Sequence, residues 1–259
     1  MDRVLVIVPY AFDDAEAVGN REAQLKSVKL GPDISFEFRP VKAGPAMFDS
    51  YHDWLLADLA MFEAGLNAQE EGFSAVCIDT VSDSGMNALR SVLDIPVIAP
   101  ARASYHTALM LGNRFCVITQ WDPWIAEAWK TIKEYGLESK CAAVESINVE
   151  PDLENLLGGK EDEIFPKLLE ASHRAIDRGA DVVTLGSTTM HQSAAYLAEH
   201  LPVPVLNPGP LTYKLAELCI GLKVSHSRKA YQAPRVEKRE MVHAMLKAAA
   251  QVEGSYRRV

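Results

Sequence analysis

A stretch of 26 residues that occurs twice constrains the fold of this chain more than any other feature. Residues 75–100 and 183–208 align without a gap at an offset of 108 positions. Each copy reads as an apolar strand, a short loop rich in hydroxyl and acidic side chains, an amphipathic helix and a second apolar strand. This matching order indicates a duplicated half. Six positions are identical: Thr80 and Thr188, Leu89 and Leu197, Leu93 and Leu201, Pro96 and Pro204, Val97 and Val205, and Pro100 and Pro208.

The segments before each copy also repeat one order of elements. Continuous apolar runs at 4–10 and 115–119 have the length of a strand and are typical of strands buried on both faces. A strand and a helix follow each run: 34–41 and 50–71 in the first half, 141–149 and 162–178 in the second. Strands alternating with long helices predict parallel sheets covered by helices. We therefore expect an α/β fold of two pseudo-symmetric halves.

The same pattern gives the domain boundaries. We place the first half at residues 1–103 and the second at 104–208, because the Ser104 hydroxyl can cap a helix that begins there. Residues 209–259 contain two further helical segments. We expect these C-terminal helices to pack across both halves.

Composition narrows the classes of partner. The net charge of −9 provides no broad basic face, so we expect no nucleic-acid partner. The chain opens directly into a strand, and no apolar run approaches the roughly 18 residues of a membrane span. We expect a cytoplasmic protein that does not bind membranes, acts on a small molecule and forms a homo-oligomer.

The spacing of the cysteines and of the glycines argues against several kinds of site. No two cysteines form a CxxC pair, so we expect neither a metal site nor a disulfide framework. Neither GxGxxG nor a P-loop is present, which disfavours a nucleotide-binding protein. The four cysteines lie in apolar segments: Cys77, Cys116, Cys141 and Cys219.

Polar side chains follow the predicted strands where a ligand is expected. In open parallel α/β sheets, ligands bind beyond the carboxyl ends of the strands. Four loops meet this condition, and we expect them to lie near one another if the two halves face each other. Their candidate residues are Tyr10, Asp79, Thr80, Ser82, Asp83, Ser84, Thr119, Ser187, Thr188, Thr189 and His191.

Three stretches resemble the aspartate/glutamate/hydantoin racemase family, and its hydantoin-racemase branch in particular. They are DSGMNALRSVLDIPVIAP (83–100), RFCVIT (114–119), and LGSTTM (185–190) followed by PVPVLNP (202–208). The resemblance implies two pseudo-symmetric αβ halves with the active site between them. It also implies a cofactor-independent racemase whose substrate is a small carboxylate, a hydantoin or another cyclic amide.

The chain departs from this family at the reactive positions. Members that racemise use one cysteine from each half, on opposite faces of the substrate carbon. The positions that match these cysteines are Thr80 and Ser187. The gapless alignment instead pairs Thr80 with Thr188, so the register of the loops is uncertain by one residue. Because a hydroxyl is a far weaker acid than a thiol, we do not expect racemisation by two cysteines.

The loop hydroxyls offer an alternative role. Together with the free N–H groups at the strand-to-helix turns, they can cradle a carboxylate or a carbonyl oxygen. The alternative is that they only cap helices. The hydroxyls concerned belong to Thr80, Ser82, Ser84, Ser187, Thr188 and Thr189.

Four further side chains are candidates for acid–base or binding roles. Asp83 and His191 take equivalent places in the two copies, and either can be a general acid or base. Asp83 can instead be a helix cap, and His191 a surface histidine. Asp79 can orient Thr80 or only bond loop amides. Tyr10 can bind a substrate carbonyl or pack as an aromatic lid.

Three functions follow from these residues. The first is a racemase-family isomerase with non-cysteine acid–base residues. The second is a hydrolase or lyase of the same fold, in which Thr80 or Ser187 works with Asp79, Asp83 or His191. The third is a non-catalytic protein that binds a small molecule. None of the three requires a cofactor.

Overall fold

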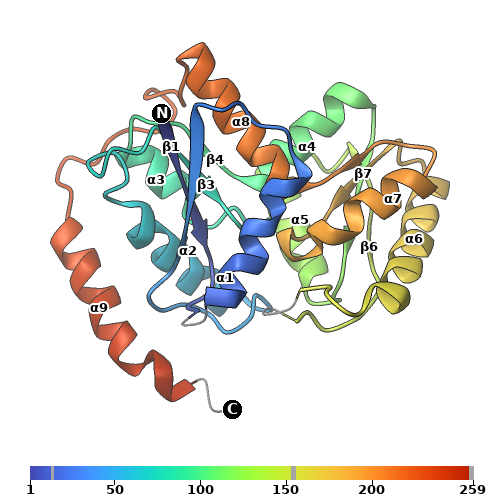
Figure 1. Cartoon of the computed structure of the whole chain (residues 1–259), viewed down its shortest axis with the longest axis horizontal. Helices are drawn as coiled ribbons and strands as arrows, with labels where there is room; N and C mark the ends of the chain where they lie inside the picture. Colours follow the sequence, from blue (N-terminus) through green and yellow to red (C-terminus); the bar gives the residue numbers. More distant parts are fainter. Residues whose placement is uncertain (13–14, 153–155, 257–259) are drawn as a thin grey trace. The chain divides into compact units, whose positions relative to one another are not determined.

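The computed structural model describes residues 1–12, 15–152 and 156–256, which form two compact units (Figure 1). Both are α/β units built on a four-stranded parallel sheet, so the predicted fold class and its duplication are confirmed. The first unit contains Met1–Val18, Lys29–Ala99 and the described part of Thr212–Val259. The second contains Gly19–Val28 and Pro100–Leu211.

The sheet of the first unit has the strand order β2-β1-β3-β4. The central strand β1 is fully buried from Val4 to Val8, as expected for an uninterrupted apolar run. Helices α2 and α3 pack together beside this sheet. The elements are β1 (Asp2–Val8), β2 (Ile34–Pro40), α2 (Tyr51–Gly65), β3 (Ala75–Ile78), α3 (Met86–Val92) and β4 (Val97–Ile98).

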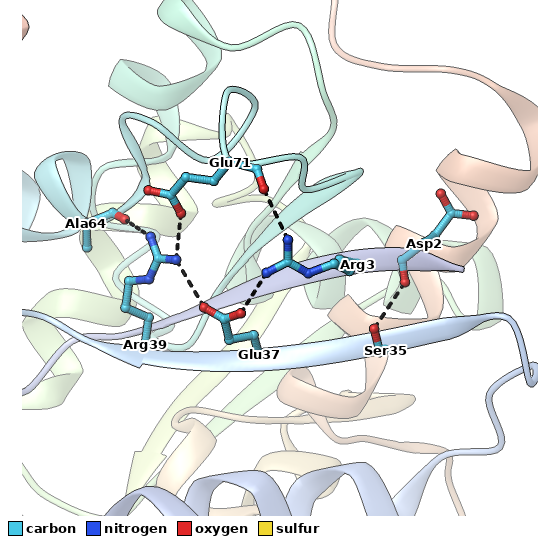
Figure 2. Close-up of polar contacts among 7 residues, drawn as sticks. All are labelled: Asp2, Arg3, Ser35, Glu37, Arg39, Ala64 and Glu71. Atoms are coloured by element: carbon cyan, nitrogen blue, oxygen red, sulfur yellow. Dashed lines mark hydrogen bonds and ion pairs between the residues drawn. The ribbon is translucent and has the colours of Figure 1, made fainter.

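The two faces of β2 differ in chemistry because its side chains alternate. Phe36 and Phe38 pack on Tyr213, with ring centroids 5.2 and 6.0 Å away. On the other face, Glu37 pairs with Arg3 of β1 and with Arg39 (Figure 2). Arg39 also pairs with Glu71, in the turn after α2, and donates to the carbonyl of Ala64 (Figure 2). This partly exposed network joins β1, β2 and the α2–β3 connection.

The sheet of the second unit repeats the topology with the order β6-β5-β7-β8. Its apolar core includes Cys116, Ile118, Leu168 and Leu197. Helices α6 and α7 pack together, as do α4 and α5. The elements are α4 (Pro100–Leu111), β5 (Phe115–Thr119), α5 (Trp124–Glu134), β6 (Cys141–Ser146), α6 (Glu161–Asp177), β7 (Val182–Leu185), the 3₁₀ helix η2 (Thr188–Ser193), α7 (Ala194–His200) and β8 (Val205–Leu206).

The unit boundaries differ from the predicted 1–103, 104–208 and 209–259. Helix α4 begins at Pro100 and not at Ser104, because proline is well suited to the first helical position. The whole helix then belongs to the second unit. The segment Gly19–Val28 also joins the second unit, although it lies early in the sequence. It carries the end of α1 (Ala15–Glu22) and the 3₁₀ helix η1 (Ala23–Ser27).

From Thr212 onward the C-terminal segment groups with the first unit. Its packing across both halves stays a prediction. The segment contains most of α8 (Pro208–Leu222) and all of α9 (Arg239–Tyr256). Helix α9 packs on α2, where His243 Nδ1 lies 2.7 Å from a carboxylate oxygen of the buried Glu63. No helix within the described residues is long and apolar enough to cross a membrane.

Candidate active site

The loop after β3 holds a chain of three buried hydroxyls. Thr80 Oγ1 lies 3.1 Å from Ser82 Oγ, which lies 2.8 Å from Ser84 Oγ. The backbone N–H of Ser82 also donates to Thr80 Oγ1, at 3.4 Å. Because a hydroxyl both donates and accepts, one end of such a chain can direct a hydrogen toward a ligand oxygen. The first loop therefore has the donors that the sequence predicted.

The loop after β7 repeats this arrangement with two hydroxyls. Ser187 Oγ lies 2.8 Å from Thr189 Oγ1 and accepts the backbone N–H of Thr189 at 3.1 Å. Ser187 is thus the N-cap of η2, as the cap interpretation predicted. The cap contact does not use its hydroxyl hydrogen, since the oxygen acts as the acceptor. Capping and ligand binding by Ser187 are therefore compatible.

Backbone hydrogen bonds resolve the one-residue uncertainty in the loop register. The N–H of Asp79 donates to Ile7 of β1, and the N–H of Gly186 donates to Ile118 of β5. These equivalent bonds give an offset of 107, which pairs Thr80 with Ser187 as the family resemblance implies. From helix α3 onward the offset is 108, because the N–H of Leu93 bonds Leu89 and the N–H of Leu201 bonds Leu197. The second copy has one extra residue, which lies in η2.

This extra residue changes which position of the second copy corresponds to Asp83. The N–H of Asp83 donates to the Thr80 carbonyl, and the N–H of Met190 donates to the Ser187 carbonyl. The backbone counterpart of Asp83 is therefore Met190, and the predicted equivalence with His191 does not hold. Asp83 is also not the helix cap, since Gly85 occupies the N-cap of α3. Asp83 has a left-handed backbone, with φ of 54°.

His191 lies in η2 and is buried, with 5% of its surface exposed. Burial and the positive charge of Arg21 lower the pKa of His191 to about 4, so the imidazole is neutral at pH 7. The ring bonds the backbone of Asn20, and Nε2 has no hydrogen-bond partner among the residues that the structure describes. The bonded atom is therefore Nδ1. Nε2 is then the unprotonated nitrogen, and its buried lone pair can accept a proton or an N–H group only from a partner that reaches it.

Arg21 is a buried charged residue that sequence reasoning missed. It is 0% exposed, and its Nη1 donates to Thr188 Oγ1 at 3.2 Å. Both residues belong to the second unit, where Arg21 lies at the end of α1. A single arginine in a weakly amphipathic stretch gave no signal in the sequence. Its importance comes from the tertiary position of the segment Gly19–Val28.

The remaining candidates are buried at the ends of their strands. Asp79 is almost fully buried directly after β3, and Thr119 is fully buried at the end of β5. Thr119 Oγ1 has no hydrogen-bond partner in the described part of the chain. Tyr10 packs edge-on against Phe48, with ring centroids 5.4 Å apart, and next to Phe12. This packing agrees with the aromatic alternative for Tyr10.

The cysteines are poor candidates for proton transfer. Burial raises the pKa of the Cys77 thiol far above its ordinary range and that of Cys116 to about 12. Burial also raises the pKa of Cys141 to about 11. A thiol must ionise to act as a base, so these side chains stay inert at neutral pH. Across residues 1–12, 15–152 and 156–256, no group of three or more His, Cys, Asp or Glu side chains could hold a metal ion.

The duplicated parallel sheets and the hydroxyl loops at their strand ends define a two-unit α/β enzyme. Residues 18–216 match the Asp/Glu/hydantoin racemase family, and the chain belongs to that family. A hydantoin racemase from Pseudomonas sp. (strain NS671) is 31% identical over 208 residues, which cover 79% of this chain and 81% of the relative.

Solved structures share the same fold. Allantoin racemase from Klebsiella pneumoniae superposes with a TM-score of 0.81 at 24% identity, covering 92% of this chain and 95% of its own. Unliganded arylmalonate decarboxylase superposes with a TM-score of 0.58 at 18% identity, covering 85% and 93%. These likenesses confirm the architecture that the duplicated sequence predicted.

Proposed function

We propose that this racemase-family enzyme exchanges the proton on a carbon beside a carbonyl group in a small cyclic amide, of the hydantoin or allantoin kind. The hydantoin racemase that is 31% identical over most of both chains is the main support for this substrate class. The matched hydroxyl loops at the ends of β3 and β7 add chemical support. Proton exchange of this kind requires no cofactor.

In this reaction the hydroxyls of the two loops donate hydrogen bonds to the substrate oxygens. When the α-proton leaves, negative charge moves onto the neighbouring carbonyl oxygen. Preorganised donors such as Ser187 and Thr80 stabilise this charge, and losing one such donor costs an enzyme about 10²–10³-fold in rate. That both loops act on one substrate remains our prediction from the sequence.

His191 Nε2 is the base that accepts the α-proton of the substrate. The C–H bond breaks, its electron pair forms the enolate, and the proton moves to Nε2 to give an imidazolium. A pKa of about 4 makes the resting imidazole a weak base. The negative charge that develops on the substrate raises this pKa during the reaction. Asp79 or Asp83, as a protonated carboxylic acid, is the candidate for delivering a proton to the carbon. The carboxylate then takes up a proton from solvent and the imidazolium releases one, which restores both groups.

Hydrolysis or elimination is the second candidate function. The replacement of both thiols by hydroxyls favours it, because two-sided proton transfer then depends on groups other than cysteine. The likeness to arylmalonate decarboxylase supports only the fold. A protein that binds a cyclic amide without turnover is the third candidate.

The test uses single enantiomers as probes. (S)-5-Benzylhydantoin, (S)-allantoin, L-aspartate and L-glutamate would each be incubated with the enzyme, with optical rotation and proton NMR followed together. We expect loss of rotation without a new compound for a cyclic amide, faster than in buffer alone. Ring opening or loss of carbon dioxide would support the second function. Binding without any turnover would reject both enzymatic functions.

A further inference from the structure

We propose that Arg21 is a positioning residue of the second-unit loop, where it holds the Thr188 hydroxyl and keeps the lone pair of His191 Nε2 available. The inference rests on the proposed function, because it concerns the loop that carries Ser187. It adds a residue that lies outside the duplicated stretch and that the loop sequence does not reveal.

The segment Gly19–Val28 reaches this loop at two points. The Arg21 guanidinium donates from Nη1 to Thr188 Oγ1, directly after Ser187 in the chain. The neighbouring backbone of Asn20 bonds the imidazole of His191. One short segment thus contacts the second and the fifth residue of the loop 187–191. These two contacts fix the hydroxyl rotamer at one end and the ring tautomer at the other.

Arg21 also supplies the nearby charge that acts on His191. Its positive charge disfavours a second positive charge on the imidazole, in addition to the effect of burial. Helix α7, which follows the loop, carries the exposed Glu199 and His200, and strand β7 contains no titratable side chain. A fully buried guanidinium in a low-dielectric site acts more strongly than an exposed charge.

The experiment compares Arg21→Gln with Arg21→Lys and with the control Arg178→Gln. Arg178 belongs to the same unit and pairs with Glu145, and its side chain is 62% exposed. Two quantities would be measured: the ratio of kcat/KM at pH 8 to that at pH 4, and the NMR titration of His191. The signal of His191 among the seven histidines is identified by its loss in His191→Gln. Circular dichroism confirms that each variant is folded.

We expect Arg21→Gln to move the His191 titration upward by about one pH unit and thereby to raise the ratio of kcat/KM at pH 8 to that at pH 4 about fivefold. Arg21→Lys keeps the positive charge, so its ratio should stay within about twofold of wild type, as should that of Arg178→Gln. A folded Arg21→Gln with an unchanged His191 titration overturns the proposal. So does an Arg21→Lys variant that shifts as much as Arg21→Gln.

If Arg21→Gln does not fold, a second variant tests whether Arg21 positions the loop. Thr188→Val removes the oxygen that holds the guanidinium, and we expect the ratio to rise at least about threefold. An unchanged ratio overturns the proposal. The NMR titration needs no substrate, so it still tests Arg21 if none of the probes turns over. Failure of this inference is thereby distinguishable from failure of the proposed function.

Discussion

Thr80 and Ser187 occupy the same position in their respective units. Each follows a buried central strand by two residues, and each hydroxyl accepts the backbone N–H two residues later, at 3.4 and 3.1 Å. Each also lies within hydrogen-bond distance of a second hydroxyl, from Ser82 or Thr189. The duplicated fold therefore places matched hydroxyl pairs at equivalent strand ends of the two units.

Removing these hydroxyls should lower activity without unfolding the protein. We expect Thr80→Ala and Ser187→Ala each to reduce kcat/KM by about 10²-fold, because each removes a donor to the developing oxyanion. Thr80→Ser and Ser187→Thr keep the hydroxyl and should lose far less. The matched control is Ser91→Ala on α3, whose hydroxyl donates to the Ala88 carbonyl. Unchanged turnover in both alanine variants would remove the loops from the mechanism.

The neutral state of His191 should make stability depend on pH. Its pKa is about 4 in the folded protein and near 6.5 when unfolded. As the pH falls below 6.5, the unfolded chain binds a proton that the folded chain does not. The free energy of unfolding should therefore decrease from pH 6.5 to about pH 4, by about 1.4 kcal/mol per pH unit from this group.

Urea denaturation across this range measures the effect. In His191→Gln the titrating group is absent, so the free energy of unfolding should decrease less steeply between pH 6.5 and 4. Equal slopes in the two proteins would show that His191 titrates normally in the folded state.

Thiol reagents should leave the native enzyme active. Cys77, Cys116 and Cys141 are buried with raised pKa values, and burial also raises the pKa of the half-buried Cys219. At pH 8 we expect iodoacetamide to modify Cys219 first and slowly in the native protein, and all four cysteines after denaturation. Intact-mass measurement with a parallel activity assay checks this. Inactivation that follows the modification of Cys77 would point to a working thiol.

Two glycines with similar backbones should respond differently to alanine. Gly72 has φ of 81°, and a Cβ added there would meet open space, so Gly72→Ala should cost only backbone strain of about 1–2 kcal/mol. Gly85 has φ of 76°, but a Cβ at this position would lie 2.9 Å from Met61 Cβ and 3.0 Å from the Phe62 nitrogen. Gly85→Ala adds overpacking of about 1–3 kcal/mol. Thermal unfolding should rank Gly85→Ala as clearly less stable, and equal melting temperatures would contradict this packing.

The parts of the fold with simple periodicity could be predicted from the sequence. The run from Val4 to Val8 is buried on both faces, as an uninterrupted apolar strand must be. The start of α4 was placed four residues late because the Ser104 cap signal was preferred to Pro100. Proline at the first helical position is a comparable signal, so the two cues could not be ranked locally.

The candidate site could be predicted only where its residues follow the predicted strands. The hydroxyls of Thr80 and Ser187 follow strands, and strand ends in parallel sheets mark ligand sites. Arg21 lies outside the repeat, and its contact with Thr188 spans 167 positions of the sequence. No local pattern encodes such a contact. The extra residue in η2 also escaped detection, because a gapless alignment absorbs it without losing the identity of Thr80 with Thr188.

The central claim is proton exchange beside a carbonyl without a cysteine. The most direct test incubates (S)-5-benzylhydantoin in deuterated solvent with enzyme whose accessible thiols have been alkylated. Proton NMR then measures the loss of the C5 proton signal as deuterium replaces that proton. We predict that the C5 proton signal disappears at the rate of the untreated enzyme and far faster than in buffer, and that Ser187→Ala slows this loss about 10²-fold. A C5 proton that exchanges no faster than in buffer, or only before alkylation, would contradict the claim.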